Sequence, residues 1–240
     1  MNPVLFLRQS LLHLCFPAHC QSCGCALLPQ SRAPMPRNLC QDCLGNLCRQ
    51  AQQPRFLVEG LEGRALLWYE DEAARLVRLI KEGGHSGLLR CLAAQWANFP
   101  LDGEAHFLLV PVPTHAHRRR ERGGDPVEDL CALWSKAWKL KWRRLLRRRA
   151  GRHQRGLGAG ERRRNLDGQY VLRGHIRLQD MPPLVLVDDV MTTGATLQLC
   201  RQVLESAGGQ VVGALTLACA PNPLLRLEAL DSLDMEEMKD

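Results

Sequence analysis

Two adjacent carboxylates, Asp188 and Asp189, follow the apolar run Leu184–Val187 and precede a turn rich in hydroxyl groups. An entirely apolar run is typical of a strand buried on both faces of a parallel sheet, and open α/β sheets bind ligands beyond the carboxyl ends of their strands. The segment after the carboxylates begins a helix, whose first backbone N–H groups attract anions. Gly194 would let the backbone approach a phosphate closely. We therefore expect a phosphate to bind at this turn, beside the two carboxylates.

A phosphorylated sugar satisfies both halves of this pattern. Its vicinal hydroxyls can donate hydrogen bonds to Asp188 and Asp189, the expected catalytic pair, which also suit Mg²⁺ because that ion binds through one or two carboxylates and phosphates. The alternative is a plain capped turn between a strand and a helix, with Thr192 or Thr193 as the N-cap. The residues expected to bind the phosphate are Thr192, Thr193, Gly194, Ala195 and Thr196.

Seven of the eleven cysteines lie within the first 48 residues. Two Cys-x-x-Cys pairs in this region are separated by 16 residues, which is within the range of four-cysteine zinc sites. Four thiolates close the coordination shell, so we expect a small structural zinc ribbon. Its expected ligands are Cys20, Cys23, Cys40 and Cys43. Cys25 is an alternative to Cys23, and the neighbours expected not to bind are Cys15, His19 and Cys48.

The formal charge of +7 is concentrated in basic segments. Nine Lys or Arg residues and no acid lie between Lys139 and Arg155, and a shorter basic run spans Arg118–Arg122. A localised basic face favours polyanionic partners, either nucleic acid or phosphorylated small molecules. The longest mostly apolar stretch, Val211–Ala220, is about ten residues, whereas a membrane span needs roughly 20. With no recognisable targeting segment, we expect no membrane insertion and a cytoplasmic location.

Short apolar runs alternate with amphipathic ones from about Phe56 onward. The periodicity predicts strands at 65–69, 107–112, 170–172, 184–187 and 211–218, and helices at 72–82, 127–138 and 196–207. Strands that alternate with helices indicate an α/β fold with a mostly parallel sheet and flanking helices. A polar segment over residues 49–55 favours a boundary. We therefore expect a zinc-ribbon domain and linker in residues 1–55 and an α/β domain with an acidic C-terminal tail in residues 56–240.

Several motifs together resemble the ComF/GntX family of competence-associated proteins, which are similar to phosphoribosyltransferases. The segment from Leu184 through the two aspartates to Thr196 is similar to the phosphoribosyl-pyrophosphate signature of type I phosphoribosyltransferases. The resemblance covers nearly the whole chain and implies a type I phosphoribosyltransferase-like fold with an N-terminal zinc finger. The other matching motifs are Phe16-Pro17, Leu79-Ile80-Lys81 with Gly83-Gly84, Val110-Pro111-Val112-Pro113 with the run 118–123, His153-Gln154-Arg155-Gly156-Leu157 and Arg164-Asn165.

The resemblance also implies binding of phosphoribosyl pyrophosphate with Mg²⁺, and a link to DNA uptake or use. Residues 115–125 would form a mobile basic cover that neutralises the departing pyrophosphate and excludes water. The residues implied for the pyrophosphate loop and its cover are Pro111, Val112, Pro113, Thr114, Arg118, Arg119 and Arg122, with Lys81 as a further candidate. This chain has Gly124-Asp125-Pro126 where the family typically has Phe-Asn-Gln, so a flexible pair and a carboxylate replace an aromatic ring and two amides.

Two functions follow from these features. As a type I phosphoribosyltransferase, the protein would transfer the phosphoribosyl group to an acceptor and release pyrophosphate. The alternative is a non-catalytic protein that senses phosphoribosyl pyrophosphate, or that binds single-stranded DNA or DNA-processing proteins. Trp134, Trp138 and Trp142 accompany the basic residues, as in base-stacking surfaces. However, Trp134 and Trp138 lie four apart on an apolar helix face, and we expect both to be core residues.

Overall fold

A computed structural model describes residues 19–27, 39–50, 54–82, 86–95, 106–149, 168–174 and 176–221 of the chain. Its main sheet has six strands in the order β1-β2-β8-β7-β3-β4. β1 is antiparallel to β2, and every other neighbouring pair is parallel. These strands are β1 (Arg55–Val58), β2 (Leu61–Trp68), β3 (Leu108–Pro111), β4 (Lys141–Trp142), β7 (Leu184–Met191) and β8 (Val211–Cys219). The expected α/β fold with a mostly parallel sheet is thus confirmed.

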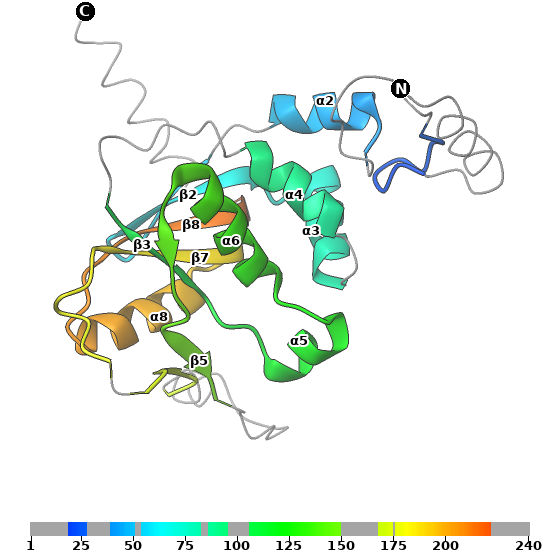
Figure 1. The fold of residues 1–240 in the computed structure, drawn as a ribbon. Helices are drawn as coiled ribbons and strands as arrows, with labels where there is room; N and C mark the ends of the chain where they lie inside the picture. Colours follow the sequence, from blue (N-terminus) through cyan, green and yellow to red (C-terminus); the bar gives the residue numbers. More distant parts are fainter. Residues whose placement is uncertain are drawn as a thin grey trace, which may run out of the picture.

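Helices cover both faces of this sheet (Figure 1). The helices that the structure describes are α2 (Gln41–Gln50), α3 (Asp71–Glu82), α4 (Ser86–Gln95), α5 (Ala116–Arg122), α6 (Pro126–Trp138) and α8 (Ala195–Ser206), of which α3, α4 and α6 lie on one face of the sheet and α8 on the other. Successive side chains of a strand point to opposite faces. Leu109 and Val185 accordingly lie in a core cluster with α3, α4 and α6, whereas Leu108 and Leu184 lie in a second cluster with α8. This two-sided burial explains why the start of β7 is apolar at every position. Within the described ranges, no helix is both long and apolar enough to cross a bilayer.

A two-stranded antiparallel sheet lies beside the main one. β5 (Leu146–Arg148) pairs with β6 (Tyr170–Leu172), with Leu146 opposite Leu172 and Arg148 opposite Tyr170. Leu146 and Tyr170 are buried in the same cluster as the apolar face of α8. The small sheet therefore packs on the α8 side of the molecule, where it can form a wall next to the ends of the main strands.

The N-terminal cysteine region packs on α3 and contributes to the core of the α/β unit. Leu39 and Leu47 are buried in one cluster with Leu76 and Ile80 of α3. Ser22, within the first cysteine turn, donates a hydrogen bond to the Glu72 carboxylate of α3, and the Arg75 guanidinium donates to Ser22 Oγ at 2.7 Å. Residues on both sides of position 55 thus share one core. The expected division into two domains at this residue stays a prediction.

The main departure from the sequence-based expectation is the length of β7, which continues past Val187 to Met191. The parallel neighbour β8 keeps pairing with it, because Asp188 lies opposite Thr216 and Met191 lies opposite Cys219. Asp188 and Asp189 therefore belong to the strand itself, and its pairing with β8 holds their backbone in place. The other expected helices and strands are present with ends shifted by a few residues, whereas β1, β4, β5, α2, α4 and α5 had no clear signal in the sequence pattern.

Gly194 joins β7 to α8 and packs against the turn between β1 and β2. Its φ is +75°, and a Cβ atom there would lie 2.4 Å from Cγ1 of Val58. The same turn is held by the Gln198 side-chain amide, which donates to the Val58 carbonyl, and by Arg201, which donates to the Glu59 carbonyl at 3.3 Å. The sequence interpretation gave this glycine a role in phosphate approach alone. The structure shows that packing and backbone conformation also require it.

We therefore expect Gly194→Ala to destabilise the fold as well as to alter the turn. The added Cβ must displace Val58 and also occupy a left-handed conformation, so the free energy of unfolding should fall by about 1–3 kcal/mol. Gly124→Ala is the matched control, because a Cβ there lies no closer than 4.0 Å to any neighbouring atom. Urea denaturation followed by circular dichroism measures both variants, and equal midpoints for the two would contradict this account.

Candidate functional site

The connections that leave β3 and β7 run in opposite directions. β3 leads through α5 and α6 to its outer neighbour β4, whereas β7 leads through α8 to β8 on its other side. The backbone N–H of Val112 donates to the Val187 carbonyl at 2.8 Å and holds the two strand ends together. Adjacent parallel strands with diverging connections leave a crevice at their carboxyl ends, which is where open α/β sheets bind ligands. Strand order thus points to this crevice independently of any sequence motif.

A cavity of about 220 Å³ occupies the crevice, and we call it the aspartate cavity. Its walls come from the ends of α3, β3 and β7, the first turn of α8, α5 and the small β5–β6 sheet. Two carboxylates face four cations there. The lining residues are Lys81, Val112, Pro113, Thr114, His115, Arg118, Arg122, Arg148, Tyr170, Asp188, Asp189, Val190 and Thr196. The excess of positive charge suits a ligand that carries phosphates.

The cavity gathers most of the residues expected from the sequence, although they come from three separate stretches of the chain. Those brought together are Lys81, Val112, Pro113, Thr114, Arg118, Arg122, Asp188, Asp189 and Thr196. Pro111 and Arg119 line a neighbouring cavity. The lining of the aspartate cavity does not include Thr192, Thr193, Gly194 or Ala195. A phosphate-binding role for these four residues stays a prediction.

The two aspartates have different electrostatic surroundings. Lys81 of α3 forms an ion pair with Asp189, with 2.9 Å between Nζ and Oδ1. The Asp189 backbone N–H donates to Oδ1 of Asp188 at 2.8 Å. Burial raises the pKa of Asp188 well above its usual range, and the adjacent Asp189 carboxylate raises it further, against the opposing effects of the Asp189 N–H and Lys81. Asp189 is thus paired with a lysine, while Asp188 is a carboxyl group that resists ionisation.

Asp125 fastens the Pro113–Thr114 segment to helix α6. It is buried, and its Oδ1 accepts a hydrogen bond from the Val127 N–H at 3.1 Å as the N-cap of α6. The Thr114 hydroxyl donates to its other carboxylate oxygen. The sequence interpretation treated residues 124–126 as a flexible departure from the family pattern. An Asp before a Pro at the first helical position, with acids in the next turn, is the helix-start signal that could have identified it.

Residues 116–122, expected within a mobile basic cover, form the short helix α5, which ends at Gly123 in a left-handed conformation. Within it, Arg118 and Arg122 line the aspartate cavity. Arg119 instead donates to the Glu128 carboxylate at 3.0 Å, which also accepts from Arg144 at 2.6 Å. The arginines of this segment therefore divide between two places, because successive helical positions face different directions.

Sequence reasoning missed Arg148 and Tyr170, which face each other across β5 and β6. The Arg148 guanidinium lies 5.3 Å from the centroid of the Tyr170 ring and donates to Oε1 of Gln169 at 3.2 Å. Burial raises the pKa of Tyr170, partly offset by the positive charge of Arg148, so the phenol is neutral. Arg148 is one of many arginines in its segment, and only its pairing with β6 distinguishes it. It adds a cation held in a fixed position on the cavity wall.

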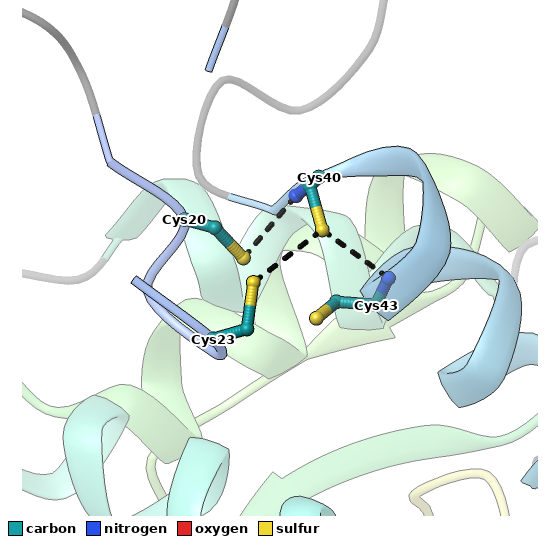
Figure 2. A group of neighbouring side chains, drawn as sticks. All are labelled: Cys20, Cys23, Cys40 and Cys43. Carbon is teal, nitrogen blue, oxygen red and sulfur yellow. Dashed lines mark hydrogen bonds between the residues drawn. The ribbon is translucent and has the colours of Figure 1, made fainter. Parts of the chain in front are cut away.

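The four expected zinc ligands lie together near α3, as Figure 2 shows. The Sγ atoms of Cys20, Cys23, Cys40 and Cys43 all lie within 4.8 Å of one another. Cys23 Sγ and Cys40 Sγ are 3.7 Å apart, and sulfurs of a tetrahedral zinc site with bonds of about 2.3 Å are separated by roughly 3.8 Å. The four cysteines could therefore hold a zinc ion. The first pair lies in a turn closed by the bridge between His19 and Ala26, and the second begins α2.

Hydrogen bonds to sulfur favour thiolates in this cluster. The Cys40 backbone N–H donates to Cys20 Sγ at 3.3 Å. A hydrogen bond from the Cys25 backbone N–H lowers the pKa of Cys23 to about 6, whereas the neighbouring Cys23 thiolate raises the pKa of Cys25 to about 12. Zinc binds the deprotonated form, and it is Cys23, not Cys25, whose sulfur belongs to the group of four that lie within 4.8 Å of one another.

Comparison with known proteins finds relatives over part of the chain. It is 33% identical over 106 residues to the DNA utilization protein YhgH of Escherichia coli strain K12, a match that covers 43% of this chain and 45% of that protein. It is 31% identical over 117 residues to Competence protein F of Haemophilus influenzae, covering 47% and 50% respectively. These proteins are homologues of the chain. The matches span about half the length of each relative, and no protein-family model matches the chain.

Among solved structures, the chain is similar to two phosphoribosyltransferases. Adenine phosphoribosyltransferase from Thermoanaerobacter pseudethanolicus is 13% identical, with a TM-score of 0.38 over 73% of this chain and 87% of that one. Orotate phosphoribosyltransferase from Aeropyrum pernix is 19% identical, with a TM-score of 0.31 over 76% and 85%. The α/β fold described above rests on strand order and pairing, not on these likenesses.

The choice between Cys23 and Cys25 can be tested by metal content. Cys23→Ser should lose bound zinc, because it removes one of four converging thiolates, whereas Cys25→Ser should keep one zinc per chain. Elemental analysis of the purified variants, together with release of zinc to a colorimetric chelator, measures the difference. Full zinc content in Cys23→Ser with loss in Cys25→Ser would reverse the assignment.

Replacing the Asp188 carboxyl by an amide should stabilise the protein at neutral pH. Because its pKa is raised on folding, the folded state holds this proton more tightly, and the associated stability is lost as pH rises through the folded pKa. Asp188→Asn should raise the free energy of unfolding by on the order of 1 kcal/mol at neutral pH and change it little in acid. Asp189→Asn is the control, since it leaves Lys81 without its partner. Urea denaturation at both pH values decides, and a loss of stability in Asp188→Asn at neutral pH would contradict this prediction.

Proposed function

We propose that the aspartate cavity binds phosphoribosyl pyrophosphate and that the protein transfers the phosphoribosyl group in a process connected with DNA uptake or use. The observation that carries the proposal is the placement of two adjacent carboxylates against four cations where the connections of β3 and β7 diverge. A sugar that bears both a phosphate and a diphosphate needs both kinds of partner. The motif around Asp188 and Asp189 resembles a phosphoribosyl-pyrophosphate signature, which adds support.

Each wall of the cavity suits one part of this ligand. Asp188 and Asp189 would accept hydrogen bonds from the ribose hydroxyls, in addition to the one that Asp188 accepts from the Asp189 N–H. Arg118, Arg122 and Arg148 would contact the diphosphate, since guanidinium groups bind phosphate oxygens in pairs. Mg²⁺ would neutralise charge on the diphosphate, and the two aspartates are the carboxylates of the cavity that could hold it.

The reaction that fits this arrangement is displacement of pyrophosphate at the anomeric carbon. Negative charge builds on the departing pyrophosphate, and fixed guanidinium groups stabilise that charge without reorganising. The positive charge that develops on the ribose ring would be stabilised by the carboxylates that line the cavity. Asp125 would act as a positioning residue, because it fixes Thr114 and the segment that carries the pyrophosphate-facing backbone.

The connection with DNA rests on the names of the homologues and on the basic surface. A non-catalytic protein that binds single-stranded DNA is the second candidate, favoured by Trp142, which is half-buried with the Arg144 guanidinium 5.7 Å from its ring centroid. Trp134 is fully buried, as expected, whereas Trp138 is half-buried and stacks on it at the edge of the core with 5.4 Å between ring centroids. Base stacking would therefore depend on Trp142.

Isothermal titration with phosphoribosyl pyrophosphate and Mg²⁺ tests the main proposal. Asp188→Asn/Asp189→Asn should weaken binding about tenfold or more, because both aspartates would contact the ligand. The control is Asp129→Asn/Asp180→Asn, which removes two exposed carboxylates that do not line the cavity. The direction of the effect is decisive. If charge alone bound this anion, removing two negative groups from the cavity would tighten binding, and that result would overturn the proposal.

A further inference from the structure

A second, smaller cavity of about 110 Å³ adjoins the aspartate cavity, and we call it the arginine cavity. The two share Arg148 and the segment Val112–Thr114, but neither Asp188 nor Asp189 lines the smaller one. Its other walls come from α5, α6 and the small β5–β6 sheet. This volume is sufficient for a phosphoryl-sized group, and a ligand there would place its anion next to the aspartate cavity.

Five guanidinium groups and two carboxylates line the arginine cavity, which leaves a formal charge of +3. Both carboxylates are committed to contacts within the protein. Glu128 accepts from Arg119 at 3.0 Å and from Arg144 at 2.6 Å. Asp125 accepts from the Val127 N–H and the Thr114 hydroxyl. The remaining positive charge therefore has no internal carboxylate to balance it among the residues that line this cavity.

Arg147 and Arg173 are the exposed members of this set that the small sheet brings together. Arg147 lies on β5, and the Arg173 backbone N–H donates to the Leu145 carbonyl at 2.8 Å, which extends the pairing past the end of β6. In the described part of the chain, neither arginine forms an ion pair with a carboxylate. Like charges held close together raise the free energy of the site, and a bound anion would relieve this repulsion.

We propose that the arginine cavity is a second anion site that binds a phosphoryl group, with Arg147 and Arg173 as its principal contacts. Planar guanidinium groups suit phosphate oxygens. Five of them line this cavity, which is three more than are needed to balance the charge of its two carboxylates. This inference extends the proposed function, since it gives the protein a second ligand that carries its own phosphate beside the phosphoribosyl donor. The phosphate belongs either to a mononucleotide or to the backbone of single-stranded DNA, and the experiment separates these sources.

The test compares two double variants that remove equal charge. Arg147→Gln/Arg173→Gln removes the proposed contacts, whereas Lys136→Gln/Lys141→Gln removes two exposed cations that line neither cavity. Each protein is titrated with thymidine monophosphate, with a short oligothymidylate and with phosphoribosyl pyrophosphate plus Mg²⁺. Circular dichroism confirms that each variant is folded. We expect the arginine variant to lose about tenfold or more in affinity for the first or second probe, the lysine variant to lose little, and both to keep the third.

The pattern of losses identifies the source of the phosphate and separates the two proposals. Loss with the mononucleotide supports a mononucleotide ligand, and loss with the oligonucleotide alone supports a DNA backbone. Equal losses of affinity in both double variants would show that the effect depends only on net charge, and would overturn the second site. A wild-type protein that binds neither thymidine monophosphate nor the oligothymidylate would also overturn it. A wild-type protein that binds them through Arg147 and Arg173 but ignores phosphoribosyl pyrophosphate would overturn the proposed function and leave the second site standing.

Discussion

Parallel pairing of β7 with neighbours on both sides is the constraint on which the rest of the molecule depends. β8 holds β7 in register as far as Met191, and β3 pairs with it from Leu184 to Val187. Two adjacent carboxylates are thereby fixed on a rigid strand, where mutual repulsion would otherwise drive them apart. The diverging connections of β3 and β7 then open the space in front of them. The cavity is a consequence of strand order, and its chemistry is a consequence of which side chains the strand ends carry.

Long-range contacts fix the cations and the loop around these carboxylates. Lys81 reaches Asp189 from the last turn of α3, and its charge lowers the cost of placing two acids side by side. Asp125 joins Thr114 to the start of α6, so the loop after β3 moves with a helix and not independently. Preorganised groups of this kind stabilise developing charge more effectively than mobile ones.

The sequence predicted those features that depend on local pattern. The apolar run before Asp188, the cysteine spacing and the periodicity of α3 and α6 each carry their own signal within a few residues. The pairing of Arg148 with Tyr170 has no such signal, because it requires β5 and β6 to meet across a long connection. The end of β7 was placed too early for the same reason, since pairing with Thr216 and Cys219 extends it. The role of Asp125 as a helix N-cap could have been predicted, because an Asp followed by Pro is a local signal for the start of a helix. The interpretation of residues 124–126 considered instead the aromatic ring and the amides that this chain lacks there.

The distribution of charge around the aspartate cavity argues for a ligand over a purely structural role. In the described residues, the arginines that line this cavity form no ion pair with either aspartate, although all of them share one small space with the two acids. Charges present only for stability would pair directly, as Glu128 does with Arg119 and Arg144. Here burial and a like-charged neighbour raise the pKa of Asp188, a cost in stability that Lys81 and the Asp189 N–H offset only in part. A ligand with hydroxyls on one side and phosphates on the other would satisfy the acids and the arginines at once.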